Sequence, residues 1–277
     1  MSNETLLSNL DPEVLERLRC SRREAIAKAA KAGLGAAVLT SLPVGLALSA
    51  REAYGQGTPA QVLAVLNFAL TLEYLEAEFY TRGLAAASLI PADRRSIFQT
   101  ISDHETAHVA LLRGAITGAG GTPVAKPNFD FSAGNGGVAY NATTATGNGP
   151  YATVFTNYQT FLAVSQAFED TGVRAYKGQA TVLKKTPTLT IALQIHSVEA
   201  RHAAIIRRLR NEKGWITSNT TTVPGAAGVY AGEENTTQGG VNLSAALTYA
   251  TGAQLTESFD EPLTDVQVLA IVDPFIV

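Results

Sequence analysis

Cysteine is almost absent from this sequence. One cysteine, Cys20, occurs among 277 residues, close to the N-terminus. It falls within a segment that reads as a leader, so the mature chain would have none. A chain without cysteine excludes disulfides, cysteine catalysis, iron–sulfur clusters and thiolate zinc sites.

Basic residues are also sparse. The formal net charge is −3, and no dense basic run follows residue 35, which argues against nucleic acid as a partner. No nucleotide-binding, haem-attachment or Ser/His/Asp signature is present either. Apolar residues make up 46% and charged residues 16% of the chain, so a sizeable core is expected.

The N-terminal segment resembles a twin-arginine export signal. Residues 21–28 read SRREAIAK, and an Ala/Gly-rich apolar run follows from residue 29 to residue 50. Small-residue patterns at 47–49 and 53–55 both fit a cleavage site, and the second is preferred. We therefore expect a leader over residues 1–55, a mature start near Gln56, and a periplasmic or extracellular location.

A retained membrane anchor is the alternative, since about 20 apolar residues can span a bilayer. Alanine and glycine are only weakly apolar. Export with cleavage is thus the preferred interpretation, leaving no stable membrane span after processing.

Four long segments have helical periodicity, at about 58–84, 91–117, 151–181 and 187–213. Short links predict that the first and second helices, and the third and fourth, are antiparallel neighbours. The second and third are joined by the Gly/Thr/Asn-rich residues 118–150, long enough to cross the bundle from end to end. We therefore predict an all-α four-helix bundle over residues 56–215, with one crossover and parallel second and third helices.

Residues 216–277 differ in composition from the bundle. Residues 217–245 are rich in Thr, Gly and Asn and predict an irregular arm. A short helix follows, capped by Thr264, with Val268, Leu269 and Val272 on its apolar face. We expect this C-terminal extension to pack on the bundle.

Charged residues interrupt the middle of each apolar helix stripe. The residues on these central stripes are Glu73 in the first helix, Glu105 and His108 in the second, Glu169 in the third, and Glu199 and His202 in the fourth. Each stripe should face the bundle centre, so four carboxylates would meet at one level of the core. Burying them unpaired costs several kcal/mol. Two divalent cations would balance their charge, and two neutral imidazoles would complete the coordination.

Oxygen and imidazole ligands suit iron first and manganese second, and zinc less specifically. A single E-x-x-H motif is weak, but here two such motifs alternate with two lone glutamates, as in dinuclear carboxylate bundles. The alternative is four amphipathic helices whose glutamates lie just outside the seam.

The order of these motifs resembles bacterioferritin and its relatives over roughly residues 58–212. The strings LEYLEAEFY, DHETAH, FEDTGVRAY and VEARHA carry the resemblance. It implies a ferritin-like fold in which Glu105 and Glu199 bridge two metals, although the sequence alone would allow any carboxylate to bridge. The resemblance also makes Glu73 and Glu169 terminal ligands and gives each metal one histidine, His108 or His202.

Two further features look like exported ferritin-like proteins labelled desiccation-related. These are the glycine-rich crossover and the SFDEPLT string of the tail, alongside the leader.

Several neighbouring residues have two interpretations. Tyr80 and Tyr176 are either redox-active neighbours or core filling. Glu76 is either an extra ligand or, as we prefer, a rim or solvated residue. The remaining candidates are neighbours of the site or surface residues, with His104 expected off the seam: His104, His196, Asp103 and Asp170.

Three functions fit this pattern. The first is a dinuclear enzyme that oxidises ferrous iron or reduces dioxygen or peroxide during stress, with metal ions and small oxidants as its partners. The second is iron storage, and the third is a metal-stabilised structural or desiccation-protection protein. The long crossover and tail argue against a 24-subunit mineral cage, while a smaller homo-oligomer stays open.

Overall fold

The computed structural model describes residues 60–277 apart from residues 138 and 185. The predicted leader, residues 1–55, lies outside the described residues. None of the described helices is long and apolar enough to cross a membrane.

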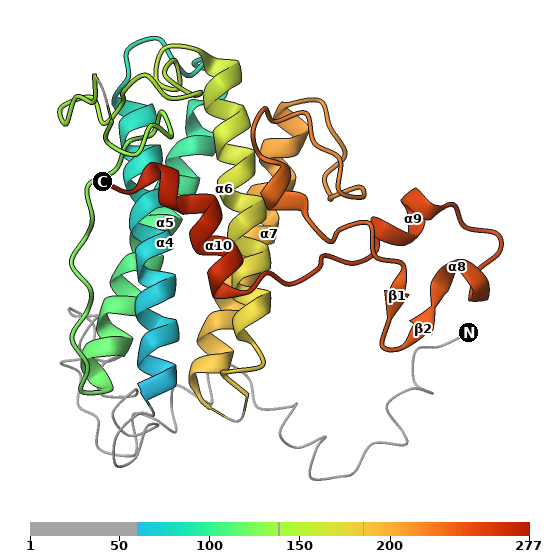
Figure 1. Cartoon of the computed structure of the whole chain (residues 1–277). Coiled ribbons are helices and arrows are strands. Elements are labelled where there is room, and N and C mark those ends of the chain that lie inside the picture. The colour runs from blue at the N-terminus through green and yellow to red at the C-terminus, as the bar shows by residue number, and fades with distance from the viewer. Residues whose placement is uncertain (1–59, 138, 185) are drawn as a thin grey trace, which may run out of the picture. The chain divides into compact units, whose positions relative to one another are not determined.

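Four long helices form the bundle (Figure 1): α4 (Ala60–Ala85), α5 (Arg95–Gly118), α6 (Tyr158–Gln179) and α7 (Thr188–Leu209). The closest packing is between α4 and α5 and between α6 and α7. Each of these pairs is antiparallel and joined by a short link, as the sequence predicted.

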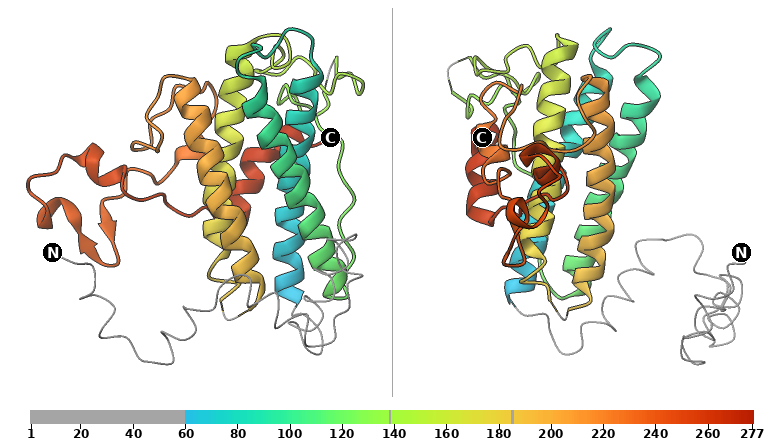
Figure 2. Two further views of the ribbon diagram at one scale, coloured as in Figure 1. Left: turned by 180° about the vertical axis from the view of Figure 1, so that it is seen from behind. Right: turned by 90° about the vertical axis from the view of Figure 1, so that its right-hand side faces the viewer.

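The long connection between α5 and α6 crosses the bundle. In Figure 1 both helices run downwards, while the green segment that follows α5 climbs from the lower to the upper end. Figure 2 shows the same path from behind. The predicted ferritin-like topology with one crossover is therefore confirmed.

Two of the helices begin later than their periodicity suggested. α5 begins at Arg95 rather than Pro91, because residues 92–94 form turns. α6 begins at Tyr158 rather than Tyr151, because the Asn157 side chain accepts hydrogen bonds from the backbone N–H groups of Gln159 and Thr160. The residues before Asn157 form turns instead.

The C-terminal extension contains only short elements. These are η2 (Ala227–Tyr230), β1 (Thr237–Gln238), β2 (Val241–Asn242), α8 (Leu243–Ala246), α9 (Gly252–Thr256), α10 (Asp265–Val272) and η3 (Asp273–Phe275). The two strands pair antiparallel. Thr264 caps α10 through a capping box with Gln267. Val268 and Val272 are buried, but Leu269 is exposed, so its predicted place on the apolar face was wrong.

Helix α6 is buried around most of its circumference. One side faces the bundle, and the other contacts η2 and α10. The crossover contacts the C-terminal segment that follows α10. Phe129 forms a β-bridge with Ile276, and the backbone N–H of Asp130 donates to the carbonyl of Phe275. The middle of α6 is therefore held from both sides, which fixes the position of its polar residues.

Candidate metal centre

The acidic and histidine residues of the four stripes are buried together in the bundle. Glu73, Glu105, Glu169 and Glu199 are fully buried, and His108 and His202 are nearly so. One residue or pair comes from each of α4, α5, α6 and α7. The helical periodicity therefore identified a real cluster at one level of the core.

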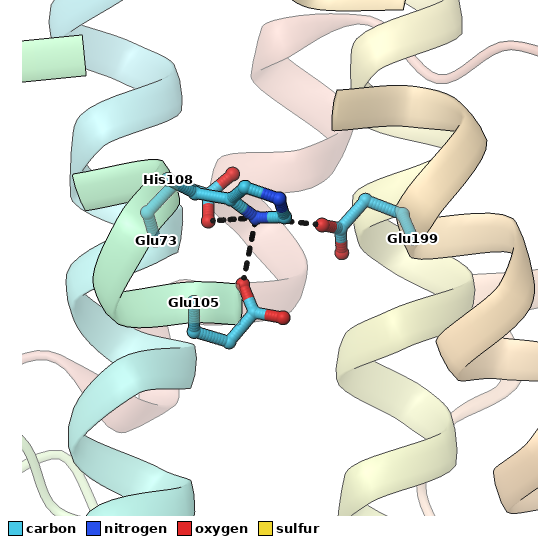
Figure 3. A group of neighbouring side chains, drawn as sticks. All are labelled: Glu73, Glu105, His108 and Glu199. Atoms are coloured by element: carbon cyan, nitrogen blue, oxygen red, sulfur yellow. Dashed lines mark hydrogen bonds and ion pairs between the residues drawn. The ribbon is translucent and has the colours of Figure 1, made fainter. Parts of the chain in front are cut away.

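The first half of the cluster surrounds His108 (Figure 3). Its Nδ1 lies 3.1 Å from Glu73 Oε2, 3.2 Å from Glu105 Oε2 and 3.2 Å from Glu199 Oε1. The three carboxylates reach the ring from α4, α5 and α7. One ligand atom from each of these four residues lies within 4.8 Å of all the others, which is a spacing that could hold one metal ion.

The second half surrounds His202. Its Nδ1 lies 2.9 Å from Glu105 Oε1 and 3.2 Å from Glu169 Oε2. Glu105, Glu169, Glu199 and His202 likewise offer ligand atoms within 4.8 Å of one another. The two groups share Glu105 and Glu199. The two oxygens of Glu105 face different histidines, as a carboxylate between two ions would.

Several buried atoms of the cluster have no hydrogen-bond partner among the described residues. They are Glu105 Oε1, Glu169 Oε2, both carboxylate oxygens of Glu199, and His202 Nδ1. His202 Nδ1 and Glu105 Oε1 are only 2.9 Å apart, so proximity is met but hydrogen-bond alignment is not. Unpaired buried polar atoms are rare in folded proteins. Buried ligand atoms that lie close together without bonding to one another suit a bound cation.

Burial and mutual repulsion perturb the carboxyl groups. Burial first, with the charge of Glu105 as a further cause, raises the pKa of Glu73 to about 7. Burial and the charge of Glu105 raise the pKa of Glu199 well above its ordinary value. The pKa of Glu169 is also raised, mainly by burial.

The pKa values of the two histidines are shifted in the direction opposite to the effect of burial. Burial alone would lower the pKa of His202, but the charge of Glu169 and the close approach of the Glu105 and Glu169 carboxylates raise it to about 11. The pKa of His108 is raised by the same kind of contact. Burial also acts to raise the pKa of Glu105, but the hydrogen bond from His108 and the close approach of His202 outweigh it and lower that pKa to about 2. Without metal, protons thus supply the positive charge that the cluster needs.

Two tyrosines bind the lone glutamates across the bundle. The Tyr80 hydroxyl of α4 donates to Glu169 Oε1 of α6. The Tyr176 hydroxyl of α6 donates to Glu73 Oε1 of α4. Each tyrosine therefore orients the carboxylate of the opposite helix pair, a role beyond core filling. Their redox activity stays a prediction.

His104 was expected off the seam, and its side chain is exposed. It nevertheless reaches the cluster from outside: its Nδ1 lies 3.0 Å from His202 Nε2, and the two rings are stacked. Because Nε2 is the far nitrogen from the carboxylates, this contact holds the orientation of the His202 ring. Only one feature of the sequence indicated this contact with the cluster, which is that His104 directly precedes Glu105.

Glu76 corrects one of the sequence interpretations. It is 3% exposed, not a rim or solvated residue, whereas the next residue, Ala77, is only partly buried. Burial, followed by the charges of Glu199 and Glu105, raises the pKa of Glu76 well above its ordinary value. Glu76 is therefore a fifth buried carboxylate in the neighbourhood of the cluster.

The remaining candidates lie outside the two groups. Asp103 is exposed and accepts a hydrogen bond from Gln99. Asp170 is buried but binds Arg207 rather than a histidine. His196 is half-buried and belongs to neither group.

Comparison with known proteins adds one match. The family model described as ferritin-like domain matches residues 61–212, more than half of the 277 residues. A search of curated proteins finds no match. The matched range contains the four helices, both groups of buried ligand atoms and the crossover between α5 and α6. By this match the chain belongs to the ferritin-like domain family.

Proposed function

We propose that this chain is an exported protein that binds a dinuclear iron or manganese centre and uses it to oxidise ferrous iron or to reduce dioxygen or peroxide. The observation that carries the proposal is the sharing of Glu105 and Glu199 between two ligand groups. Two ions that share carboxylates lie close enough to act on one small oxidant together.

The ligand chemistry supports the choice of metal. Glu73, Glu105 and Glu199 meet His108, and Glu105, Glu169 and Glu199 meet His202. Such oxygen-rich sets with one imidazole per ion suit iron and manganese. When bound, the metal pair supplies the electrons for oxidant reduction. The residues of the chain position this pair: Tyr80 and Tyr176 fix the outer carboxylates, and His104 fixes the ring of His202.

A purely stabilising metal site is the second candidate. The observation that favours it is that all four helices of the bundle contribute side chains to the same cluster. Ions bound there would link the four helices and stabilise only the folded state. Such a role needs no turnover.

Metal loading followed by oxidant assays separates these candidates. The purified chain is loaded without oxygen with Fe²⁺, Mn²⁺ or Zn²⁺, and bound metal is measured. We expect about two ions per chain. The iron or manganese form should consume dioxygen repeatedly while added Fe²⁺ supplies the electrons, or should disproportionate peroxide to water and dioxygen, and the zinc form should do neither. The matched variants are Glu105→Ala, which should lose most of the metal and all turnover, and the exposed Asp103→Ala, which should lose neither.

Two bound ions without oxidant consumption would reject the enzyme and leave the stabilising role. Less than one ion per chain with every metal would reject both.

Export is the part of the proposal that rests on residues 21–28. Changing Arg22 and Arg23 to lysine should hold the chain in the cytoplasm at full length, while the parent chain should appear shortened outside it. Equal distribution of the two at full length would contradict export.

A further inference from the structure

The two helix pairs contribute matching residues to the centre, with one exception. α4 and α6 each provide a lone glutamate and, seven residues later, a tyrosine, while α5 and α7 each provide an E-x-x-H motif. Three residues after the lone glutamate, however, α4 has Glu76 and α6 has Gly172. The two ligand groups are therefore matched, and the buried residues next to them differ by this one carboxylate and the missing side chain opposite it.

The missing side chain at Gly172 makes room for two carboxylates. A Cβ at this position would lie 2.9 Å from Glu199 Oε2 and 3.4 Å from Glu76 Oε1. The first distance is shorter than an ordinary carbon–oxygen contact, so even alanine would displace a carboxylate. Glu76 and Glu199 thus border the same small space, and neither Glu199 oxygen has a hydrogen-bond partner among the described residues.

We propose that Glu76 is a fifth carboxylate of the metal centre, accommodated by Gly172, and that its charge favours a metal pair carrying more than four positive charges. This inference rests on the proposed dinuclear function and deepens it by assigning the preferred charge of the pair.

Charge balance is the physical reason. Two divalent ions neutralise the four carboxylates that the two ligand groups contain, so a fifth leaves one negative charge in excess. Glu76 is 3% exposed, and no lysine or arginine forms an ion pair with it in the described part of the chain. Coulomb interactions are strong at such a buried site. Two divalent ions leave Glu76 either protonated or uncompensated, whereas a pair that includes at least one trivalent ion balances its ionised form.

Binding of redox-inert ions tests the inference without any activity assay. Zn²⁺ represents a divalent pair and Ga³⁺ a trivalent pair, each offered from a competing citrate complex to the full chain and to Glu76→Gln. We expect the substitution to weaken Ga³⁺ binding at least tenfold more than Zn²⁺ binding. Gly172→Ala should instead weaken both ions, because its Cβ would lie closest to Glu199, which both ligand groups share.

Glu78→Gln is the control for charge alone. Glu78 lies on the same helix, but it faces outwards and pairs with Arg82 and Lys126. It should change the affinities for the two ions equally or not at all. If the parent chain binds both ions and Glu76→Gln alters both affinities alike, or neither, the role of Glu76 is rejected while the dinuclear centre stands. If the parent chain binds neither ion, the proposed function fails, and this inference with it.

Discussion

Two adjacent residues of α6, Glu169 and Asp170, are both buried, yet they belong to opposite kinds of polar cluster. Asp170 accepts hydrogen bonds from Arg207 Nε at 3.0 Å, from Arg207 Nη2 at 2.6 Å and from the Tyr230 hydroxyl at 2.7 Å. Glu169 Oε2 has no hydrogen-bond partner in the described chain, although His202 Nδ1 is 3.2 Å away. The cluster of Asp170 is complete within the protein, while that of Glu169 leaves buried carboxylate oxygens without hydrogen-bond partners among the described residues.

The two clusters therefore have different roles in the protein. A charge that is paired by an arginine and a hydroxyl serves the fold, here by joining α6 to α7 and to η2. A set of carboxylates with unpartnered oxygens costs stability unless something else binds them. The same helix therefore carries a structural cluster on one side and a binding cluster on the other.

The largest expected effect comes from breaking the complete cluster. Arg207→Met leaves the Asp170 charge buried without its partner and should lower the free energy of unfolding by roughly 3–5 kcal/mol. Urea unfolding measures this with and without added metal, and the loss should be the same in both. The double change with Asp170→Leu should cost less, because no unpaired charge remains. A loss that metal fully restores would contradict the division between the clusters.

In the metal-free chain, the cluster that contains Glu73 and His202 should make the free energy of unfolding depend on pH. The folded-state pKa of Glu73 is raised to about 7 and that of His202 to about 11. At a pH between a group's pKa in the unfolded state and its higher pKa in the folded state, the folded state binds more protons. The free energy of unfolding therefore falls as pH rises through this range. The low pKa of Glu105, about 2, adds no slope above pH of about 5.

The free energy of unfolding in chelator should therefore decrease from pH 5 to pH 8. At about 1.4 kcal/mol per pKa unit, Glu73 alone contributes on the order of 3 kcal/mol. Glu199→Gln should flatten the slope, and bound metal should reverse much of the loss at pH 8. Stability that increases over this range would be inconsistent with clustered carboxyl groups of raised pKa.

The smallest expected effect concerns the two tyrosines that hold the outer glutamates. Tyr176→Phe removes the hydrogen bond to Glu73 and should cost about 1 kcal/mol. Tyr80→Phe should cost a similar amount through Glu169. Because the glutamates they orient lie in different ligand groups, each variant should weaken one of two bound ions more than the other. Calorimetric metal titration would show this; equal weakening of both ions by each variant would contradict the assignment.

Helical periodicity was enough to predict the four helices and the cluster of Glu73, Glu105, Glu169 and Glu199. Charged residues in the middle of apolar stripes must lie near one another in the core once the stripes face each other. The short–long–short pattern of connections was likewise enough to predict the crossover. The α10 cap at Thr264 was also readable, since a capping box is a local signal.

Residues whose roles depend on how helices are rotated against each other could not be predicted. Glu76 and Ala77 lie three and four residues after Glu73, and both fit a 3.6-residue period. The space at Gly172 brings Glu76 into the core, and the sequence of α4 alone does not contain that information. The partners of Asp170 come from α7 and η2, so its role depends on long-range contacts in the same way.

Anomalous X-ray scattering from crystals of the purified chain grown with Mn²⁺ tests the central claim most directly. We expect about two strong manganese peaks per chain, within one bundle, with the carboxylates of Glu105 and Glu199 between them. A single peak would contradict the dinuclear centre. No peak in the bundle, at a manganese concentration well above the protein's, would contradict metal binding altogether.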